Sequence, residues 1–219
     1  MNVFEQIVEA TVAGDKDRCV ALAQQAVSQG IDAFQALQEG YTKGMSIVGD
    51  KFAAMEYFLP ELLTCADAVK AALDVLRPHL GNSLKEGSLG TIVLGTIQGD
   101  IHDLGKNIVK TMLQASGFTV HDLGCNVSLR QFVEKATEVN ADIIAASAIL
   151  TTTMAYMPDL ASLMKELGVK DKFLFIVGGA PVTPEFAIEA GADGYGKNAV
   201  EAVDMAKRLM QEKKKREAK

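Results

Sequence analysis

The segment Gly95–Val109 combines one histidine and two carboxylates in an arrangement that suits metal binding. His102 lies two residues after Asp100 and directly before Asp103. A neutral imidazole binds a metal through one ring nitrogen, while its other nitrogen donates a hydrogen bond to a carboxylate or a carbonyl. Asp100 is close enough along a turn to be that acceptor. Because the segment offers only one good ligand, it favours a metal whose other ligands come from a macrocycle.

Three other interpretations of this segment remain open. Phosphate binding would need the glycine spacing of a P-loop and a Ser or Thr after its lysine, but Asn107 stands at that position. In the second interpretation, His102 is an ordinary loop histidine and Asp100 is a helix cap. In the third, His121 and Cys125 join His102 in a zinc site, although both are more simply explained as residues at the end of a strand.

The elements that must position this segment follow from the apolar periodicity, which changes near residue 87. Before that point, apolar residues recur every three or four positions, a pattern that predicts amphipathic helices. The expected helices run through Phe4–Val12, Cys19–Val27, residues 32–48 and Pro60–Pro78. Short helices joined by brief turns predict a four-helix bundle over residues 1–87, and the polar segment Gly81–Gly87 at its end is the expected linker.

Over residues 88–219, short apolar strands alternate with helical stretches. The expected strands are Gly90–Leu94, Phe118–His121, Ile143–Ala146, Phe173–Val177 and Gly194–Tyr195. Helices are expected to begin near Gly105, Ser128, Met154, Pro184 and Lys197. This alternation predicts an α/β domain with a doubly wound, flavodoxin-like or Rossmann-like parallel sheet, because parallel strands need crossover helices. In such sheets ligands bind beyond the carboxyl ends of the strands, and residues 95–105 follow the first of them.

The composition argues against several classes of function. The chain has 219 residues, 48% of them hydrophobic and 23% charged, and its formal net charge of −6 argues against a general nucleic-acid-binding surface. No apolar run approaches the ~20 residues needed to cross a bilayer, and the first residues lack the basic start of a signal peptide. The three cysteines, Cys19, Cys65 and Cys125, do not suggest a disulfide framework. We therefore expect a cytoplasmic protein without a membrane or nucleic-acid partner.

Three short motifs in the α/β region resemble the fingerprint of the cobalamin-binding domain of methionine synthase, B12-dependent mutases and corrinoid proteins. The family pattern is D-x-H-x-x-G, then S-x-L, then G-G. The matching residues here are Asp100, His102, Gly105, Ser147, Ile149, Gly178 and Gly179. Each motif falls at the end of an expected strand. Ile149 stands where the family usually has Leu, a volume-conserving difference that should keep an apolar pocket wall.

The helical region extends this resemblance to nearly the whole chain. Residues Val48–Leu63 are similar to the helical cap that precedes the cobalamin domain in methionine synthase and in corrinoid proteins of methanol, methylamine and O-demethylase methyltransferase systems. Cobalamin subunits of mutases generally lack this cap. The resemblance therefore implies a corrinoid protein of the methyltransferase type.

The resemblance also implies a role for the histidine and its neighbours. Cobalamin would bind with its dimethylbenzimidazole tail in a slot of the α/β domain, and His102 would replace that base as the lower axial ligand of cobalt. Asp100 would accept a hydrogen bond from the second nitrogen of His102, and the hydroxyl of Thr153 would complete this relay. Proton uptake by the relay would adjust the redox and methyl-transfer equilibria.

The other residues of the pattern would contact the tail or the faces of the corrin. Ser147 would hydrogen-bond the base of the tail, next to the apolar wall at Ile149. The glycines expected to leave room for the tail are Gly105, Gly178 and Gly179. A tight turn from strand to helix is the alternative reason for the glycine pair. Phe58 of the cap would contact the upper face of the corrin, and packing inside the bundle is the alternative for this side chain.

The implied function is that of a methyl carrier, a component of a methyltransferase system that is not a complete enzyme alone. Its cobalt(I) would accept a methyl group from a substrate:corrinoid methyltransferase, and a second methyltransferase would pass the methyl group to tetrahydrofolate or a thiol. A corrinoid-reactivating protein would be a further partner. The alternatives are the cobalamin-binding subunit of a radical mutase, a cobalamin-dependent sensor and a flavodoxin-like receiver.

Overall fold

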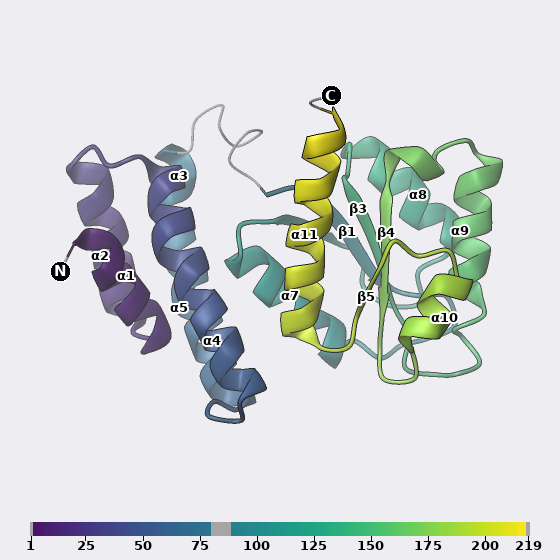
Figure 1. The fold of residues 1–219 in the computed structure, drawn as a ribbon, viewed down its shortest axis with the longest axis horizontal. Helices are drawn as coiled ribbons and strands as arrows, with labels where there is room; N and C mark the ends of the chain where they lie inside the picture. Colours follow the sequence, from purple (N-terminus) through teal and green to yellow (C-terminus); the bar gives the residue numbers. More distant parts are fainter. Residues whose placement is uncertain (1, 80–88, 218–219) are drawn as a thin grey trace. The chain divides into compact units, whose positions relative to one another are not determined.

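All the regular elements within residues 2–79 are helices, and parallel strands alternate with helices within residues 91–217 (Figure 1). The computed structural model describes residues 2–79 and 89–217, so the expected linker Gly81–Gly87 lies outside the described residues. Two compact units are present, Met1–Ser88 with Thr111–Phe118, and Leu89–Lys110 with Thr119–Lys219.

Four helical stretches form the first region, as expected. They are α1 (Val3–Val12), α2 (Lys16–Ser28), the stretch α3 (Ala33–Gln35), Ala36–Thr42 and α4 (Lys43–Ala53), and finally α5 (Leu59–Leu76). The third stretch ends at Ala53 instead of near Val48, and its middle part, Ala36–Thr42, is a π-helix. Gly40 and Gly44 lie on this stretch because a Cβ at either position would be 2.6 Å from a side chain of α1.

Side-chain caps explain where these helices begin. The side chain of Asn2 accepts a hydrogen bond from the N–H of Glu5, whose carboxylate accepts one from the N–H of Asn2. Asp15 caps α2 in a similar way through the N–H of Arg18. Among the described residues, no helix combines the length and the apolar character needed to cross a bilayer.

The second region contains a five-stranded parallel sheet, which confirms the α/β fold class. Its strands are β1 (Thr91–Thr96), β2 (Thr119–Asp122), β3 (Ile143–Ser147), β4 (Leu174–Gly178) and β5 (Gly194–Gly196), in the order β2-β1-β3-β4-β5. All five expected strands are present, and each extends by one or two residues at its carboxyl end. As a result Ser147 lies opposite both Thr96 and Gly178 in the sheet.

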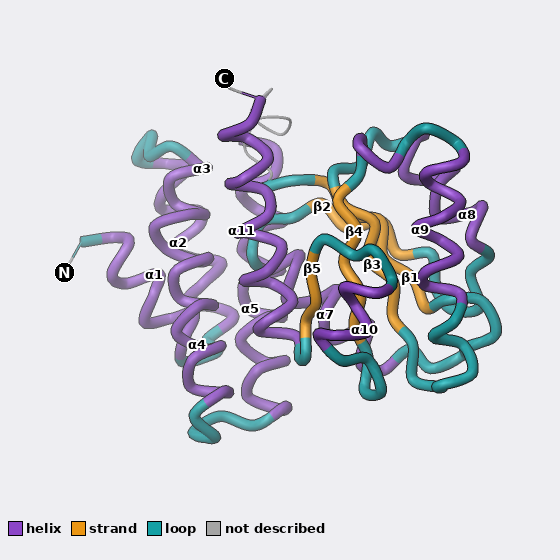
Figure 2. Tube along the Cα trace, turned by 45° about the vertical axis from the view of Figure 1, so that its right-hand side comes forward, coloured by secondary structure: helices purple, strands orange, loops and turns teal. Residues whose placement is uncertain are grey.

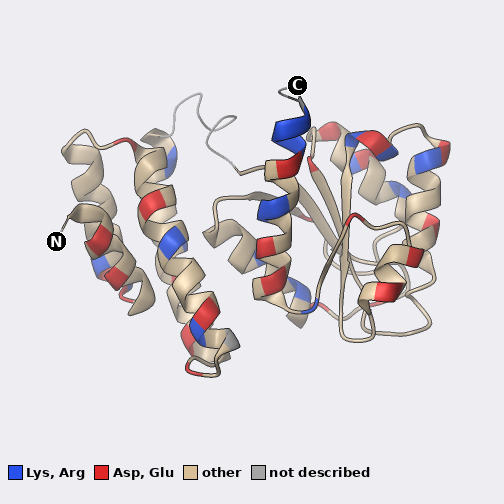
Figure 3. Ribbon diagram, viewed as in Figure 1, with Lys and Arg blue, Asp and Glu red and all other residues tan. Residues whose placement is uncertain are grey.

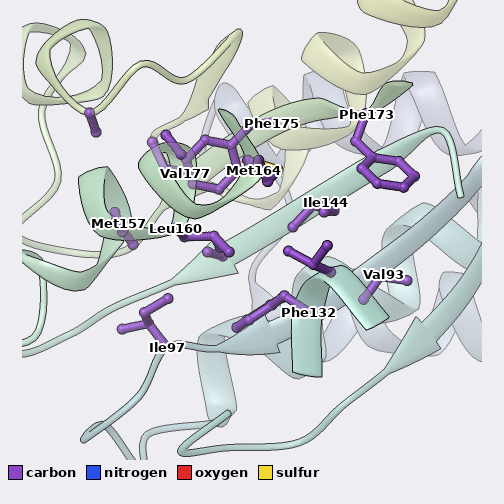
Figure 4. Close-up of a cluster of buried hydrophobic side chains, with 14 of the residues drawn as sticks. Val93, Ile97, Phe132, Ile144, Met157, Leu160, Met164, Phe173, Phe175 and Val177 are labelled. Atoms are coloured by element: carbon purple, nitrogen blue, oxygen red, sulfur yellow. The ribbon is translucent and has the colours of Figure 1, made fainter. Parts of the chain in front are cut away.

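Helices cover both faces of the sheet, as the doubly wound prediction requires (Figures 1 and 2). They are α7 (Leu104–Ala115), α8 (Leu129–Glu138), α9 (Tyr156–Glu166), α10 (Pro184–Glu189) and α11 (Ala199–Glu217). The core beneath α8 and α9 includes Ile144 and Phe175 of the sheet with Phe132 and Leu160 of the helices (Figure 4). Each such side chain contributes roughly 1.5–3 kcal/mol by leaving water.

Charged side chains of both signs are distributed over the helices, and basic residues gather at the end of α11 (Figure 3). The last turn of α11 contains Lys214, Lys215 and Arg216. Cations at this end interact favourably with the helix dipole. Lys213 also pairs with Asp142 at 2.7 Å, and this ion pair connects α11 to the residue that precedes β3.

Candidate functional site

The three expected motifs meet at one edge of the sheet, because they follow adjacent parallel strands. Thr96 at the end of β1, Ser147 at the end of β3 and Gly178 at the end of β4 are register partners. The loop that contains His102 follows β1, and the loop that contains Thr153 follows β3. The register therefore places these residues at the edge where ligands bind in parallel sheets.

The carboxylate of Asp100 is buried and connects the loop after β1 with the loop after β3. Its Oδ1 accepts a hydrogen bond from the N–H of His102 at 3.0 Å and lies 2.7 Å from His102 Nδ1. Its Oδ2 accepts hydrogen bonds from the N–H groups of Ile149 at 2.7 Å and Leu150 at 3.1 Å. One carboxylate thus determines the relative position of the two loops.

The hydroxyl of Thr153 has two acceptors for its single proton. It lies 3.3 Å from Asp100 Oδ2 and 2.8 Å from the carbonyl oxygen of Leu150. The shorter contact is the stronger hydrogen bond, so the proton is directed mainly to Leu150. The structure brings Thr153 next to Asp100, as the expected relay requires.

The hydrogen bonds around Asp100 also determine which nitrogen of His102 is protonated. Burial alone would raise the pKa of Asp100, but hydrogen bonds from His102, Ile149 and Leu150 outweigh burial and hold the pKa well below its usual range. The carboxylate is therefore ionised and accepts a hydrogen bond from Nδ1. A neutral His102 then carries its proton on Nδ1 and keeps a free lone pair on Nε2. Half of the side chain of His102 is exposed, so this nitrogen is accessible.

The glycines of the motifs differ in whether the chain itself requires them. Gly179 has a φ of +124°, and a Cβ there would overlap the carbonyl oxygen of Ala148. A Cβ on Gly178 would lie 2.9 Å from the carbonyl oxygen of Gly196. The turn at Gly179 and the close approach of β5 to Gly178 are therefore sufficient reasons for glycine at these two positions. In contrast, a Cβ on Gly105 would meet no atom within 4 Å, and the packing of the described chain does not require a glycine there.

The remaining predicted residues are accessible. Ser147 is half-buried, and its hydroxyl has no hydrogen-bond partner within residues 2–79 and 89–217. Ile149 is partly exposed, as are the apolar side chains of Ile101 and Leu104 on either side of His102. Phe58, in the helical unit, is 63% exposed, so the alternative that it packs inside the bundle is wrong.

A buried ion pair that the motifs of the sequence do not predict lies beside the histidine loop. Lys106 is almost fully buried, and its Nζ lies 2.7 Å from Asp122 Oδ1 at the end of β2. Lys110 approaches Oδ2 of this carboxylate at 2.9 Å, and the N–H of Gly124 donates to Oδ1, the oxygen that pairs with Lys106. The feature of the sequence that could have indicated this ion pair is the spacing of the two lysines, because residues four apart share one face of a helix.

Asp122 makes the stability of the folded chain depend on pH. Burial would raise the pKa of this carboxyl, but hydrogen bonds from Lys106 and Lys110 outweigh burial and lower it to about 2. A carboxyl with a lowered folded pKa stabilises the fold above its unfolded pKa of about 4, and this stabilisation is lost as the pH falls towards about 2. We expect Asp122→Asn to reduce the free energy of unfolding at pH 7 by roughly 2 kcal/mol, and by much less near pH 2.

Urea unfolding of the cofactor-free protein at a series of pH values measures this difference. Glu134→Gln, at an exposed position of α8, is the matched control and should change the free energy of unfolding little at any pH. A difference between wild type and Asp122→Asn that stays constant from pH 7 to pH 3 would contradict the assignment.

His121 and Cys125, the residues of the zinc alternative, are both half-buried at the end of β2 and in the loop after it. Within the part of the chain that the structure describes, no three His, Cys, Asp or Glu side chains are grouped so that they could hold a metal ion.

Comparison with known proteins shows similarity along the whole chain. Residues 3–77 and residues 90–204 match two family models, each described as a B12 binding domain. A corrinoid protein of Desulfitobacterium hafniense is 41% identical over 212 residues, which cover 96% of this chain and 98% of that protein. Dimethylamine corrinoid protein 2 of Methanosarcina acetivorans is 41% identical over 209 residues, which cover 95% of this chain and 96% of that protein.

Solved structures show the same similarity. A cobalamin-binding protein from Desulfitobacterium hafniense matches with a TM-score of 0.80 and 33% identity, over 94% of this chain and 98% of that one. A chain of the methanol:cobalamin methyltransferase complex from Methanosarcina barkeri matches with a TM-score of 0.81 and 28% identity, over 95% of this chain and 80% of that one. Both matches include the helical region as well as the sheet.

Proposed function

Because the chain belongs to the family of B12-binding corrinoid proteins, we propose that it is the methyl-carrying component of a methyltransferase system. The observation that carries this proposal is the pair formed by the accessible imidazole of His102 and the buried carboxylate of Asp100. The names of the similar proteins mention dimethylamine in one case and methanol in another. This supports a carrier whose methyl donor is selected by its partner enzyme.

The residues at the sheet edge fit a corrinoid cofactor. The free Nε2 of His102 is a single nitrogen donor, which suits a metal already bound by a macrocycle. The exposed apolar side chains of Leu104 and Ile149 suit the lower face of that ring. Gly105 faces open space that a side chain would fill, and the hydroxyl of Ser147 is free to bind a polar group of the tail.

In this proposal His102 would bind the cobalt of the cofactor, and the other residues would position the imidazole or hold the tail. Asp100 keeps the proton on Nδ1 and so presents the lone pair of Nε2 to the cofactor. Thr153 lies within reach of Asp100 and can turn its hydroxyl from Leu150 to that carboxylate. When bound, the corrinoid supplies a cobalt(I) centre that takes up a methyl group from one enzyme and releases it to another.

The helical region over residues 1–87 is then the cap, and residues 88–219 are the cofactor-binding domain. The exposed Phe58 would contact the corrin, and the glycine pair Gly178-Gly179 would leave room for the tail. The partners are a substrate-specific methyltransferase, a second methyltransferase with tetrahydrofolate or a thiol as acceptor, and a corrinoid-reactivating protein. The protein acts in the cytoplasm, without nucleic acid or membrane.

Titration of the full chain with methylcobalamin and with adenosylcobalamin tests this proposal. A methyl carrier has to hold an upper ligand as small as a methyl group, so we expect methylcobalamin to bind at least ~10-fold more tightly. Tighter binding of adenosylcobalamin would favour the mutase subunit, and oligomers that form only with cofactor would favour the sensor. Either result would overturn the proposal, and so would a failure of the protein to bind either compound.

A further inference from the structure

The loop after β2, residues 123–127, contacts the loop that contains His102. Val127 forms a parallel bridge with Ile97, which extends the pairing of β2 and β1 beyond the two strands. The N–H of Thr96 donates a hydrogen bond to the carbonyl oxygen of Gly124 at 2.9 Å. The carbonyl oxygen of Thr96 accepts a hydrogen bond from the N–H of Val127 at 3.0 Å. The first residues of the histidine loop are therefore held by backbone hydrogen bonds to the loop after β2.

Within the loop of residues 123–127, Asn126 hydrogen-bonds to the backbone of residues just before His102. Its side-chain oxygen accepts the N–H of Gly99 at 2.8 Å. Its own N–H donates to the carbonyl oxygen of Asp100 at 2.8 Å. Asn126 thus binds the peptide groups on both sides of the peptide bond that joins Gly99 to Asp100.

The backbone of Asn126 has a conformation that permits both contacts. Its φ is +52°, in the left-handed region that asparagine adopts more readily than most residues other than glycine. A residue with a larger or branched side chain would be strained there. The position therefore needs both a left-handed backbone and a hydrogen-bond acceptor on a short side chain.

The ion pair of Lys106 and Asp122 supports the same loop from its ends. Lys106 lies in the first turns of α7, directly after the histidine loop, and Asp122 lies directly before the supporting loop. Asp122 also accepts the N–H of Gly124 within that loop. The two loops are consequently joined at Asn126 in the middle and at this buried ion pair.

We propose that Asn126 is a positioning residue for the axial histidine, acting through the peptide that carries the Asp100 carboxylate. This inference rests on the proposed function. Asp100 orients the imidazole of His102 by the 2.7 Å contact to Nδ1. Asn126 holds the backbone carbonyl of Asp100, whereas Ile149 holds its carboxylate. Without its acceptor, the N–H of Gly99 loses its partner and the carboxylate loses part of its support.

Two substitutions of Asn126 separate the acceptor from the backbone conformation. Asn126→Gly keeps the left-handed backbone and removes the acceptor, whereas Asn126→Asp keeps an acceptor oxygen at the same place. Asn140→Gly is the matched control, because Asn140 has a similar φ of +49° but precedes β3 at the opposite edge of the sheet. All three variants retain a residue that tolerates a positive φ.

The first measurement uses the cofactor-free protein, in which the ¹⁵N chemical shifts of the His102 ring report the position of its proton. Wild type, Asn126→Asp and Asn140→Gly should show a proton held on Nδ1. Asn126→Gly should shift towards a mixture of the two tautomers. The second measurement is the affinity for aquocobalamin, which should fall about 10-fold in Asn126→Gly and recover in Asn126→Asp, since partners behind a metal ligand typically change affinity by 10- to 100-fold.

A melting temperature that falls in Asn126→Gly while the ring shifts and the affinity stay at wild-type values would show a purely structural role and overturn the inference. The same holds if Asn140→Gly has an equal effect on His102. If wild type binds no cobalamin, the proposed function fails, and the ring shifts of the cofactor-free variants still decide whether Asn126 positions His102.

Discussion

We expect the replacement of His102 by alanine to remove the proposed nitrogen ligand of the corrinoid and to slow methyl transfer by more than ~100-fold. The magnitude follows because residues behind a metal ligand already change activity by 10- to 100-fold, and His102 is the proposed ligand itself. The ultraviolet–visible spectrum of the protein loaded with methylcobalamin should change from the form with a bound nitrogen to the form without one. Single-turnover transfer to an acceptor measures the loss of rate.

His121→Ala is the matched control for this experiment. His121 lies in β2, half-buried, and takes no part in the Asp100 network. We expect this variant to keep the wild-type spectrum and rate. Unchanged spectra of His102→Ala, with cobalamin still bound, would remove His102 as the ligand.

We expect the replacement of Gly105 by leucine to prevent cobalamin binding and to leave the cofactor-free fold intact. A Cβ at this position meets no atom within 4 Å, so the side chain extends into the space proposed for the tail. The substitution also improves helix propensity at the start of α7, by up to ~1 kcal/mol. The bound cobalamin per chain after reconstitution should fall close to zero, while the melting temperature of the cofactor-free protein stays constant or rises.

Gly179→Val is the comparison, because we expect this variant to destabilise the cofactor-free fold. Its Cβ would overlap the carbonyl oxygen of Ala148 in a backbone conformation that side chains rarely adopt, so we expect a loss of at least ~3 kcal/mol of folding free energy. That loss corresponds to a melting temperature lower by roughly 6–12 °C in a chain of this size.

Normal cobalamin content in Gly105→Leu would show that the space beside Gly105 does not take the tail.

The sequence predicts the architecture because its periodicities are long and regular. Five alternations of strand and helix left few arrangements other than a parallel sheet, and all five expected strands are present. The predicted carboxyl ends of the strands were less accurate, because Thr96, Ser147 and Gly178 are polar or glycine residues that the apolar pattern did not assign to a strand. The π-helical turn at Ala36–Thr42 has no signature in the apolar pattern, which continues through it.

The candidate site was predicted from short motifs, and the structure adds the contacts between them. The sequence placed Asp100 near His102 because they are two residues apart, but the bonds from Ile149 and Leu150 depend on loops that fold together from distant parts of the chain. The support from Asn126 was missed for the same reason. The sequence alone could not show why the glycine pair is present, because a slot for the tail and a tight turn both demand glycine. The backbone geometry was needed to decide.

Electron paramagnetic resonance of the protein loaded with cob(II)alamin identifies the nitrogen that binds the cobalt. The unpaired electron of cobalt(II) couples to the nucleus of the axial nitrogen, so its splitting identifies the source of that nitrogen. When only the histidines of the protein carry ¹⁵N and the cofactor carries ¹⁴N, ligation by His102 predicts that each cobalt line splits into a doublet, and that His102→Ala loses the doublet. A triplet that persists in the labelled wild-type protein would mean that the nitrogen belongs to the cofactor, and would contradict the account.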